Sequence, residues 1–118
     1  MPPNLFSITV DCKDPQTLAT FWSQLTGYEV TTAFEGFAEL RGDGSVGPRF
    51  MFMQVEEPKS AKNRMHIDLD APDLDAEVER VLGLGATLVG RYEEYGITWA
   101  TFHDPEGNEF CIGVHPPQ

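Results

Sequence analysis

Hydrophobic and polar residues alternate along several short stretches of this chain, and along two others an apolar residue recurs every three or four positions. Alternation is typical of a strand with one buried face, whereas the longer period is typical of a helix with one apolar side. In the first half of the chain the alternation predicts strands over Leu5–Val10, Tyr28–Thr32, Phe34–Arg41 and Arg49–Val55.

The helix of the first half is predicted between Asp14 and Gly27. An aspartate can cap the start of a helix, Pro15 fits the first helical position, and glycine accepts the left-handed backbone that follows the last turn. We expect the apolar stripe of this helix to pack on one face of the strands. The stripe consists of Leu18, Phe21, Trp22 and Leu25.

The same order returns after residues 56–63, a polar segment without periodicity that we interpret as a linker. Asp73 is predicted to cap a second helix, which Gly83 and Gly85 are predicted to end. The apolar stripe of this helix consists of Leu74, Val78, Val81 and Leu82. Strands are predicted over Met65–Leu69, Ala86–Gly90, Ile97–His103 and Glu109–Gly113.

Two segments of eight residues match position by position as strand, loop and helix cap. They are residues 7–14 (SITVDCKD) and residues 66–73 (HIDLDAPD). Such a repeat favours two βαβββ modules, at about residues 5–55 and 64–114, within a single domain of residues 1–118. We expect an α+β fold in which the helices lie on the outer face and the two curved sheets form a shared cleft.

A hairpin near the end of the chain indicates which residues would face this cleft. Asp104-Pro105-Glu106-Gly107 has the residue preferences of a type I turn. The strand after it alternates, so Glu109 and Cys111 share one face while Phe110 and Ile112 share the other. In the remaining strands the alternation puts Phe50 and Phe52 under a helix and the following residues in the cleft: Ser7, Thr9, Asp11, Arg49, Met51, Met53, His66, Asp68 and Asp70.

Composition narrows the classes of partner. Nineteen acidic residues against eight basic ones give a net charge of -11, which disfavours nucleic acid and anionic membranes and favours a cationic ligand. No apolar run approaches the roughly 20 residues that a membrane helix needs. Cys12 and Cys111 are too few for a disulfide framework or a cysteine-based zinc site, and free thiols suit a cytoplasmic location.

Three segments resemble the vicinal oxygen chelate superfamily, which includes glyoxalase I, bleomycin resistance proteins and extradiol dioxygenases. They are the helix Asp14–Gly27 with its Phe21-Trp22 pair, the strand that follows His66, and Asp104–Asn108. The resemblance covers nearly the whole chain and is greatest to the small glyoxalase-like domains of bacteria. It implies the fold described above, and it implies a homodimer, since members of this family often pair.

The resemblance also implies where a metal would bind. Enzymes of this family hold one divalent metal, here Zn, Ni, Fe or Mn, with side chains from the first and last strand of each module. The matching positions are Ser7, about Met51, His66 and Cys111. His66 is a usual ligand of the family, Cys111 stands where glutamate is most common, and methionine is a poor ligand for a hard cation.

Two functions follow from these residues. The first is a cofactor-independent protein that binds a small cationic or aromatic molecule through Asp11, Met51, Met53, Asp68, Tyr95 and Trp99. The aromatic residues could instead close a hydrophobic edge together with Tyr92. The second is a metal-dependent lyase, isomerase or dioxygenase in which His66 is joined by Glu109 or Cys111, with Asp68 as a further candidate ligand. Glu109 and Cys111 are also the candidate catalytic residues. A third option is a module of a larger assembly without chemistry of its own.

Overall fold

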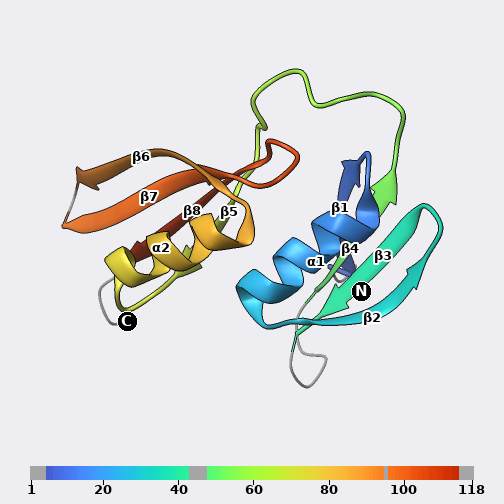
Figure 1. Cartoon of the computed structure of the whole chain (residues 1–118), viewed down its shortest axis with the longest axis horizontal. Helices are drawn as coiled ribbons and strands as arrows, with labels where there is room; N and C mark the ends of the chain where they lie inside the picture. Colours follow the sequence, from blue (N-terminus) through green and yellow to red (C-terminus); the bar gives the residue numbers. More distant parts are fainter. Residues whose placement is uncertain (1–4, 43–47, 95, 115–118) are drawn as a thin grey trace. The chain divides into compact units, whose positions relative to one another are not determined.

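The computed structural model describes residues 5–42, 48–94 and 96–114 of the chain (Figure 1). The chain divides into two units, Met1–Pro58 and Lys59–Gln118. Each unit contains a four-stranded mixed sheet and one helix in the order βαβββ, so the predicted α+β fold of two repeated modules is confirmed. Neither helix among the described residues is long and apolar enough to cross a membrane.

The first unit is built on a sheet with the strand order β1-β4-β3-β2. The pair formed by β1, an edge strand, and β4 is parallel, and the other two pairs are antiparallel. The elements are β1 (Ser7–Cys12), α1 (Pro15–Thr26), β2 (Glu29–Phe34), β3 (Phe37–Arg41) and β4 (Arg49–Gln54).

Helix α1 begins and ends where the sequence predicts. The Asp14 carboxylate accepts hydrogen bonds from the Thr17 backbone amide at 3.2 Å and from the Thr17 hydroxyl at 2.7 Å. Gly27 takes the left-handed conformation, with φ of 79°, that an L side chain disfavours. The predicted apolar stripe is buried, and Trp22 stacks on Phe50 of β4 with ring centroids 6.5 Å apart.

The second unit repeats this topology with the order β5-β8-β7-β6, again with one parallel pair, β5 and β8. Helix α2 packs on β6, β7 and β8, and Figure 1 shows it alongside these strands. The side chains beneath it include Phe102, Phe110 and Ile112, all fully buried. The elements are β5 (Ile67–Asp70), α2 (Leu74–Leu84), β6 (Thr87–Glu94), β7 (Ile97–His103) and β8 (Glu109–Val114).

Two details of α2 differ from the prediction. The helix runs through Gly83 and ends at Leu84, and Gly85 alone supplies the left-handed cap, with φ of 115°. Leu82 is 40% exposed and does not belong to the buried stripe. One residue turns a helix by about 100°, so a side chain next to the fully buried Val81 points away from the sheet.

Several strand boundaries also differ. The predicted strand Phe34–Arg41 contains a turn, because β2 ends at Phe34 and β3 begins at Phe37, with Gly36 at φ of 83° between them. Strand β6 does not stop at Gly90: the register shifts between Leu88 and Gly90, and the strand continues. Such a bulge adds a residue to one strand without ending it. The first strand is shifted by two residues from the predicted Leu5–Val10.

The predicted turn before β8 is confirmed, and its first residue has a further role. The Gly107 amide donates to the Asp104 carbonyl at 2.9 Å across the turn. The Asp104 side chain is 3% exposed, and its Oδ1 accepts from the backbone amides of Glu106 at 2.9 Å and Asn108 at 3.0 Å. The Asn108 side-chain amide donates to the same carboxylate. A buried carboxylate therefore organises the turn that begins β8.

We expect Asp104→Ala to lower the free energy of unfolding by about 1–3 kcal/mol, because it leaves backbone amides of the turn without their acceptor. Asp104→Asn should cost less, since an amide oxygen can accept the same hydrogen bonds. Urea unfolding monitored by circular dichroism measures both changes. Equal stability of Asp104→Ala and the wild type would contradict this role.

Candidate functional site

The face of the second sheet opposite α2 carries most of the predicted site residues. Because Phe110 and Ile112 are buried under α2, Glu109 and Cys111 project from the other face, as the alternation predicts. The pairing of β8 then sets the rows across this face: Cys111 stands opposite Asp68 on β5 and opposite Thr101 on β7. The next rows pair His103 with Glu109 and Trp99 with Gly113.

Three side chains on this face form what we call the donor cluster: His66, Asp68 and Cys111. Their nitrogen, oxygen and sulfur atoms all lie within 4.8 Å of one another. His66 Nδ1 is 3.2 Å from Asp68 Oδ1, and the Cys111 thiol is 3.3 Å from the Thr101 hydroxyl. The first two residues are exposed and the cysteine is partly buried. The structure thus brings two predicted metal ligands together with a predicted ligand-binding carboxylate.

Glu109 lies on the same face but is buried, with 8% of its surface exposed. Its Oε2 accepts a hydrogen bond of 2.9 Å from the Asn63 backbone amide, and its Oε1 lies 3.2 Å from the Lys59 ammonium and 3.9 Å from His103 Nε2. Burial raises the pKa of Glu109, but the Asn63 amide and the Lys59 charge outweigh it and hold the pKa below its ordinary value. Glu109 is therefore ionised at neutral pH and a weak proton acceptor there.

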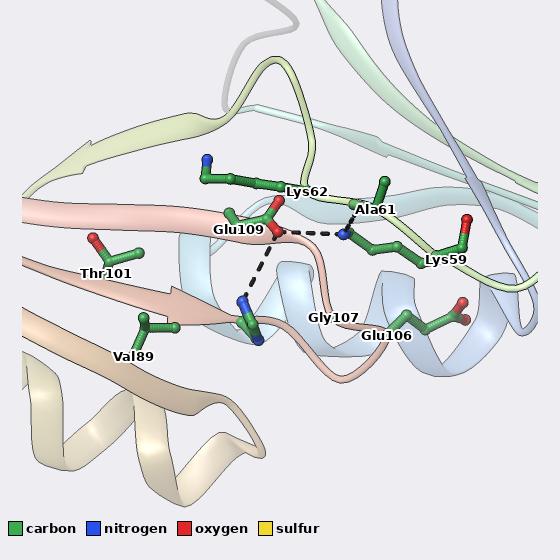
Figure 2. A pocket seen from close by; sticks show the side chains of 10 residues that line it. Lys59, Ala61, Lys62, Val89, Thr101, Glu106, Gly107 and Glu109 are labelled. Atoms are coloured by element: carbon green, nitrogen blue, oxygen red, sulfur yellow. Dashed lines mark hydrogen bonds and ion pairs between the residues drawn. The ribbon is translucent and has the colours of Figure 1, made fainter.

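The polar segment interpreted as a linker supplies these partners. Residues 55–66 form neither helix nor strand, yet Lys59 and Asn63 both bind Glu109. The Lys59 ammonium also donates to the Ala61 carbonyl (Figure 2). The segment from Lys59 to Asn63 is thus part of the second unit. The sequence carried no signal for this, because a lysine and an asparagine are ordinary residues in a polar connection.

A cavity of about 550 Å³ lies beside this ion pair. Its walls come from residues 59–62, from the turn after Asp104, and from Val89, Thr101 and Glu109 of β6, β7 and β8 (Figure 2). This volume is within the range of small-molecule sites, roughly 300–1,000 Å³. Thr101 both lines the cavity and contacts Cys111, so it connects the cavity with the donor cluster.

An aromatic pair lies on the same face, in the row that contains Trp99 and Gly113. Tyr92 stands opposite Trp99, with ring centroids 5.6 Å apart, and 45% of the tyrosine is exposed. Gly90 makes room for this ring, since a Cβ atom at position 90 would lie 2.6 Å from the Tyr92 hydroxyl oxygen. Tyr92 is the aromatic partner of Trp99 here, and the predicted Tyr95 lies outside the described residues.

In the first unit the predicted residues Asp11, Met51 and Met53 lie on β1 and β4, with Asp11 opposite Met53. Asp11 and Met53 are exposed and Met51 is partly buried. Opposite Met51 on β3 is Glu39, which the prediction did not single out. Its position corresponds to that of Thr101 in the second unit, because both residues occupy the same row of the repeated topology.

Glu39 is a buried carboxylate with its own partners. It accepts hydrogen bonds from the Thr31 hydroxyl at 2.6 Å and from Arg49 Nη1 at 2.9 Å, and the Arg49 guanidinium lies over the Phe6 ring at 4.2 Å. The bond from Thr31, together with the charge of Arg49, holds the pKa of Glu39 below its ordinary value against the effect of burial. This network makes Glu39 a structural residue of the first unit.

The side chains allow a test of the metal site that the resemblance implies. Of its four positions, Ser7 offers a hydroxyl that is 3.1 Å from the Thr9 hydroxyl, and Met51 offers a thioether, so neither is a firm ligand for a divalent ion. The donor cluster does offer the imidazole, carboxylate and thiol groups that hold zinc and related metals in proteins. The four-position site therefore does not fit a divalent metal, whereas the donor cluster does.

Comparison with known proteins agrees with this architecture. The sequence model described as a glyoxalase-like domain matches residues 7–113. A glyoxalase/bleomycin resistance protein/dioxygenase family enzyme from Burkholderia phytofirmans superposes with a TM-score of 0.81 and 21% identity, covering 95% of this chain and 98% of its own. Among proteins of curated function, none matches this sequence.

Two further solved structures are similar over most of both chains. A fosfomycin resistance protein from Listeria monocytogenes, complexed with Mn(II) and 1S,2S-dihydroxypropylphosphonic acid, gives a TM-score of 0.79 at 16% identity and covers 98% of this chain and 93% of its own. A lactoylglutathione lyase from Agrobacterium tumefaciens gives 0.68 at 16% identity, covering 97% and 95%. At these identities the similarity establishes the fold.

We expect Glu109→Gln to lower the free energy of unfolding at pH 7 by about 1–3 kcal/mol, because it removes charge-assisted bonds to Lys59 and Asn63. The pKa of Glu109 lies below its ordinary value of 4.5, so the ionised carboxylate stabilises the fold above that pH. This contribution is lost as the pH falls through the folded-state pKa. Between pH 7 and pH 3, the free energy of unfolding measured with urea should therefore fall less steeply in the variant than in the wild type.

Glu57→Gln is the matched control, since Glu57 is an exposed glutamate of the same connection. Its stability should follow the wild-type pH dependence. A Glu109→Gln profile that also follows the wild type would show that the bonds to Lys59 and Asn63 contribute nothing.

Proposed function

Because this chain belongs to the glyoxalase-like domain family of the vicinal oxygen chelate superfamily, we propose that it binds a small organic molecule on the face of the second sheet opposite α2. The observation that carries this proposal is the cavity of about 550 Å³ beside Thr101 and Glu109. A molecule held there would reach the donor cluster through Thr101 and, along the same face, the aromatic pair of Tyr92 and Trp99.

The charges on this face favour a cationic, partly aromatic ligand. Lys59 is already paired with Glu109, and the other charged residues of the cavity wall, Lys62 and Glu106, have opposite signs. The exposed carboxylate of Asp68 adds negative charge to this face, and the chain as a whole carries -11. Trp99 offers a ring on which a planar cation can stack. The contributions of Asp11, Met51 and Met53 stay predictions, as do a homodimer and a cytoplasmic location.

A second candidate function is a metal-dependent lyase, isomerase or dioxygenase, and the donor cluster is the observation that favours it. His66, Asp68 and Cys111 would hold the ion, which when bound would act as a Lewis acid toward adjacent oxygen atoms of a substrate. Of the partners predicted for His66, Cys111 and Asp68 are within reach of it, whereas Glu109 is held by Lys59 and Asn63.

The binding proposal is tested by a thermal-shift screen of cationic aromatic compounds, followed by calorimetric titration of the compound that stabilises the protein most. We expect Trp99→Ala to weaken its binding roughly twofold to tenfold, the contribution of one aromatic contact. Asp68→Asn should weaken it by a similar factor. Glu79→Gln, which removes a charge from the exposed side of α2, should leave the affinity unchanged. Equal affinities in all three variants would rule out this face as the site.

The enzymatic candidate is tested by loading chelator-treated protein with manganese, iron, nickel or zinc and assaying substrates that carry adjacent oxygens. A purely binding function predicts no turnover with any of these metals. Turnover that requires the metal and disappears in His66→Ala would replace the binding function by the enzymatic one.

A further inference from the structure

The ring of Tyr92 lies back along β6 and covers Gly90. A Cβ atom at position 90 would be 2.6 Å from the Tyr92 hydroxyl oxygen and 3.0 Å from the ring carbon that carries it. A contact of 2.6 Å is shorter than real Cβ atoms make, so the phenol occupies the place that a side chain at position 90 would fill. Residues two apart in a strand share one face, which makes this arrangement possible.

Neighbouring contacts show that this is the face opposite α2. Arg91, which stands between the two residues, turns to the helix side, where its guanidinium pairs with Asp75 of α2 at 2.6 Å. Tyr92 packs on the open side against Trp99, with ring centroids 5.6 Å apart. The phenol therefore belongs to the same face as the cavity.

The Tyr92 hydroxyl lies at the rim of the cavity. Gly90 stands opposite Thr101 on β7, and Val89 precedes it in the bulge of β6. Thr101 and Val89 both line the cavity (Figure 2). Directly opposite residues have Cβ atoms about 4.5–5.5 Å apart, so the Tyr92 hydroxyl is at most about 8 Å from the Thr101 Cβ atom. One small molecule can fill the cavity and still contact the phenol.

This hydroxyl is available to such a molecule. Nearly half of the tyrosine is exposed, and within the described part of the chain no residue forms a hydrogen bond with its hydroxyl. The Thr101 hydroxyl, by contrast, is already engaged with the Cys111 thiol at 3.3 Å. A phenol oxygen can accept a hydrogen bond as well as donate one. Because the exposed Asp68 carboxylate and the net charge favour a cation here, the matching group is the N–H of a cation.

We infer that the Tyr92 hydroxyl selects cationic aromatic ligands that carry an N–H group, primary or secondary ammonium ions, over quaternary ones, and that Gly90 places it. The inference rests on the binding function proposed above and narrows its ligand class. A quaternary ammonium has no N–H to donate, so it can use only its charge and the rings of Tyr92 and Trp99. Tyr92 thus determines specificity, and Gly90 is a positioning residue.

The test is calorimetric titration of the full chain with two probes, 2-phenylethylammonium and its N,N,N-trimethyl analogue, which share one ring and one charge. We expect Tyr92→Phe to weaken binding of the first probe roughly threefold to tenfold, the net contribution of one hydrogen bond. The affinity for the second probe should not change, because the ring is kept. Tyr28→Phe, which removes a phenol hydroxyl from the first unit, should leave both affinities unchanged.

Gly90→Ala tests the positioning. The backbone of Gly90 is outside the left-handed region, so it accepts alanine, and the three atoms nearest to the added Cβ all belong to Tyr92. The ring must therefore move, and the preference for the first probe should fall as it does in Tyr92→Phe. In the double variant the preference should fall no further, because the hydroxyl is already gone. Thermal unfolding checks that each variant folds, and Tyr92→Phe decides the inference by itself if Gly90→Ala does not.

Three results would overturn the inference. Tyr92→Phe that weakens both probes equally, or neither, would show that the hydroxyl selects nothing, and the binding function would still stand. Wild-type preference in Gly90→Ala would remove the role of Gly90. Failure of 2-phenylethylammonium to bind the wild type would also overturn the inference, whereas the thermal-shift screen, with its other cationic aromatic compounds, decides the binding function separately.

Discussion

Burial of Phe110 and Ile112 beneath α2 fixes the phase of β8, and the chemistry of the second unit depends on that phase. In a strand, each residue that enters the core turns its neighbours to the opposite face. Glu109 and Cys111 are therefore committed to the side away from the helix, and the register of β8 with β5 and β7 brings Asp68 and Thr101 beside the thiol. A slip of one residue would bury a carboxylate and a thiol under α2 and expose two large apolar side chains.

The two units use a buried carboxylate in different ways. In the first unit Glu39 is held by Thr31 and Arg49, all on strands of one sheet. In the second unit Glu109 is held by Lys59 and Asn63, which come from a segment without secondary structure. An irregular segment has few backbone hydrogen bonds of its own, so contacts of this kind determine its course. One wall of the cavity is therefore formed by residues 59–62, a segment whose position the sheet alone does not determine.

Much of the architecture could be read from the sequence, because the rules that determine it are local. The helix caps Asp14, Gly27 and Asp73, the turn after Asp104 and the alternation in β8 all act within a few residues. The structure differs from the prediction at positions where the local rules allow more than one backbone conformation. Gly36 makes a turn, whereas Gly90 sits in a bulge and Gly83 is carried inside a helix, and only pairing with neighbouring strands or packing on the sheet decides among these outcomes.

The candidate site could likewise be predicted only in part. The phase of β5 and β8 placed His66, Asp68 and Cys111 on one face, but their mutual distances depend on the register between strands more than 40 residues apart in the chain. The partners of Glu109 could not be predicted, since nothing in the spacing of Lys59 and Asn63 marks them as bound.

The shared strand order of the two units has a consequence for how such a protein can change over evolutionary time. Each unit pairs its own four strands and covers them with its own helix, so the framework is present in two copies. Duplicated frameworks can diverge separately: one copy carries an ion pair at the row where the other carries Thr101 beside a thiol. A change of chemistry in one half therefore requires no change in the strand pairing of the other.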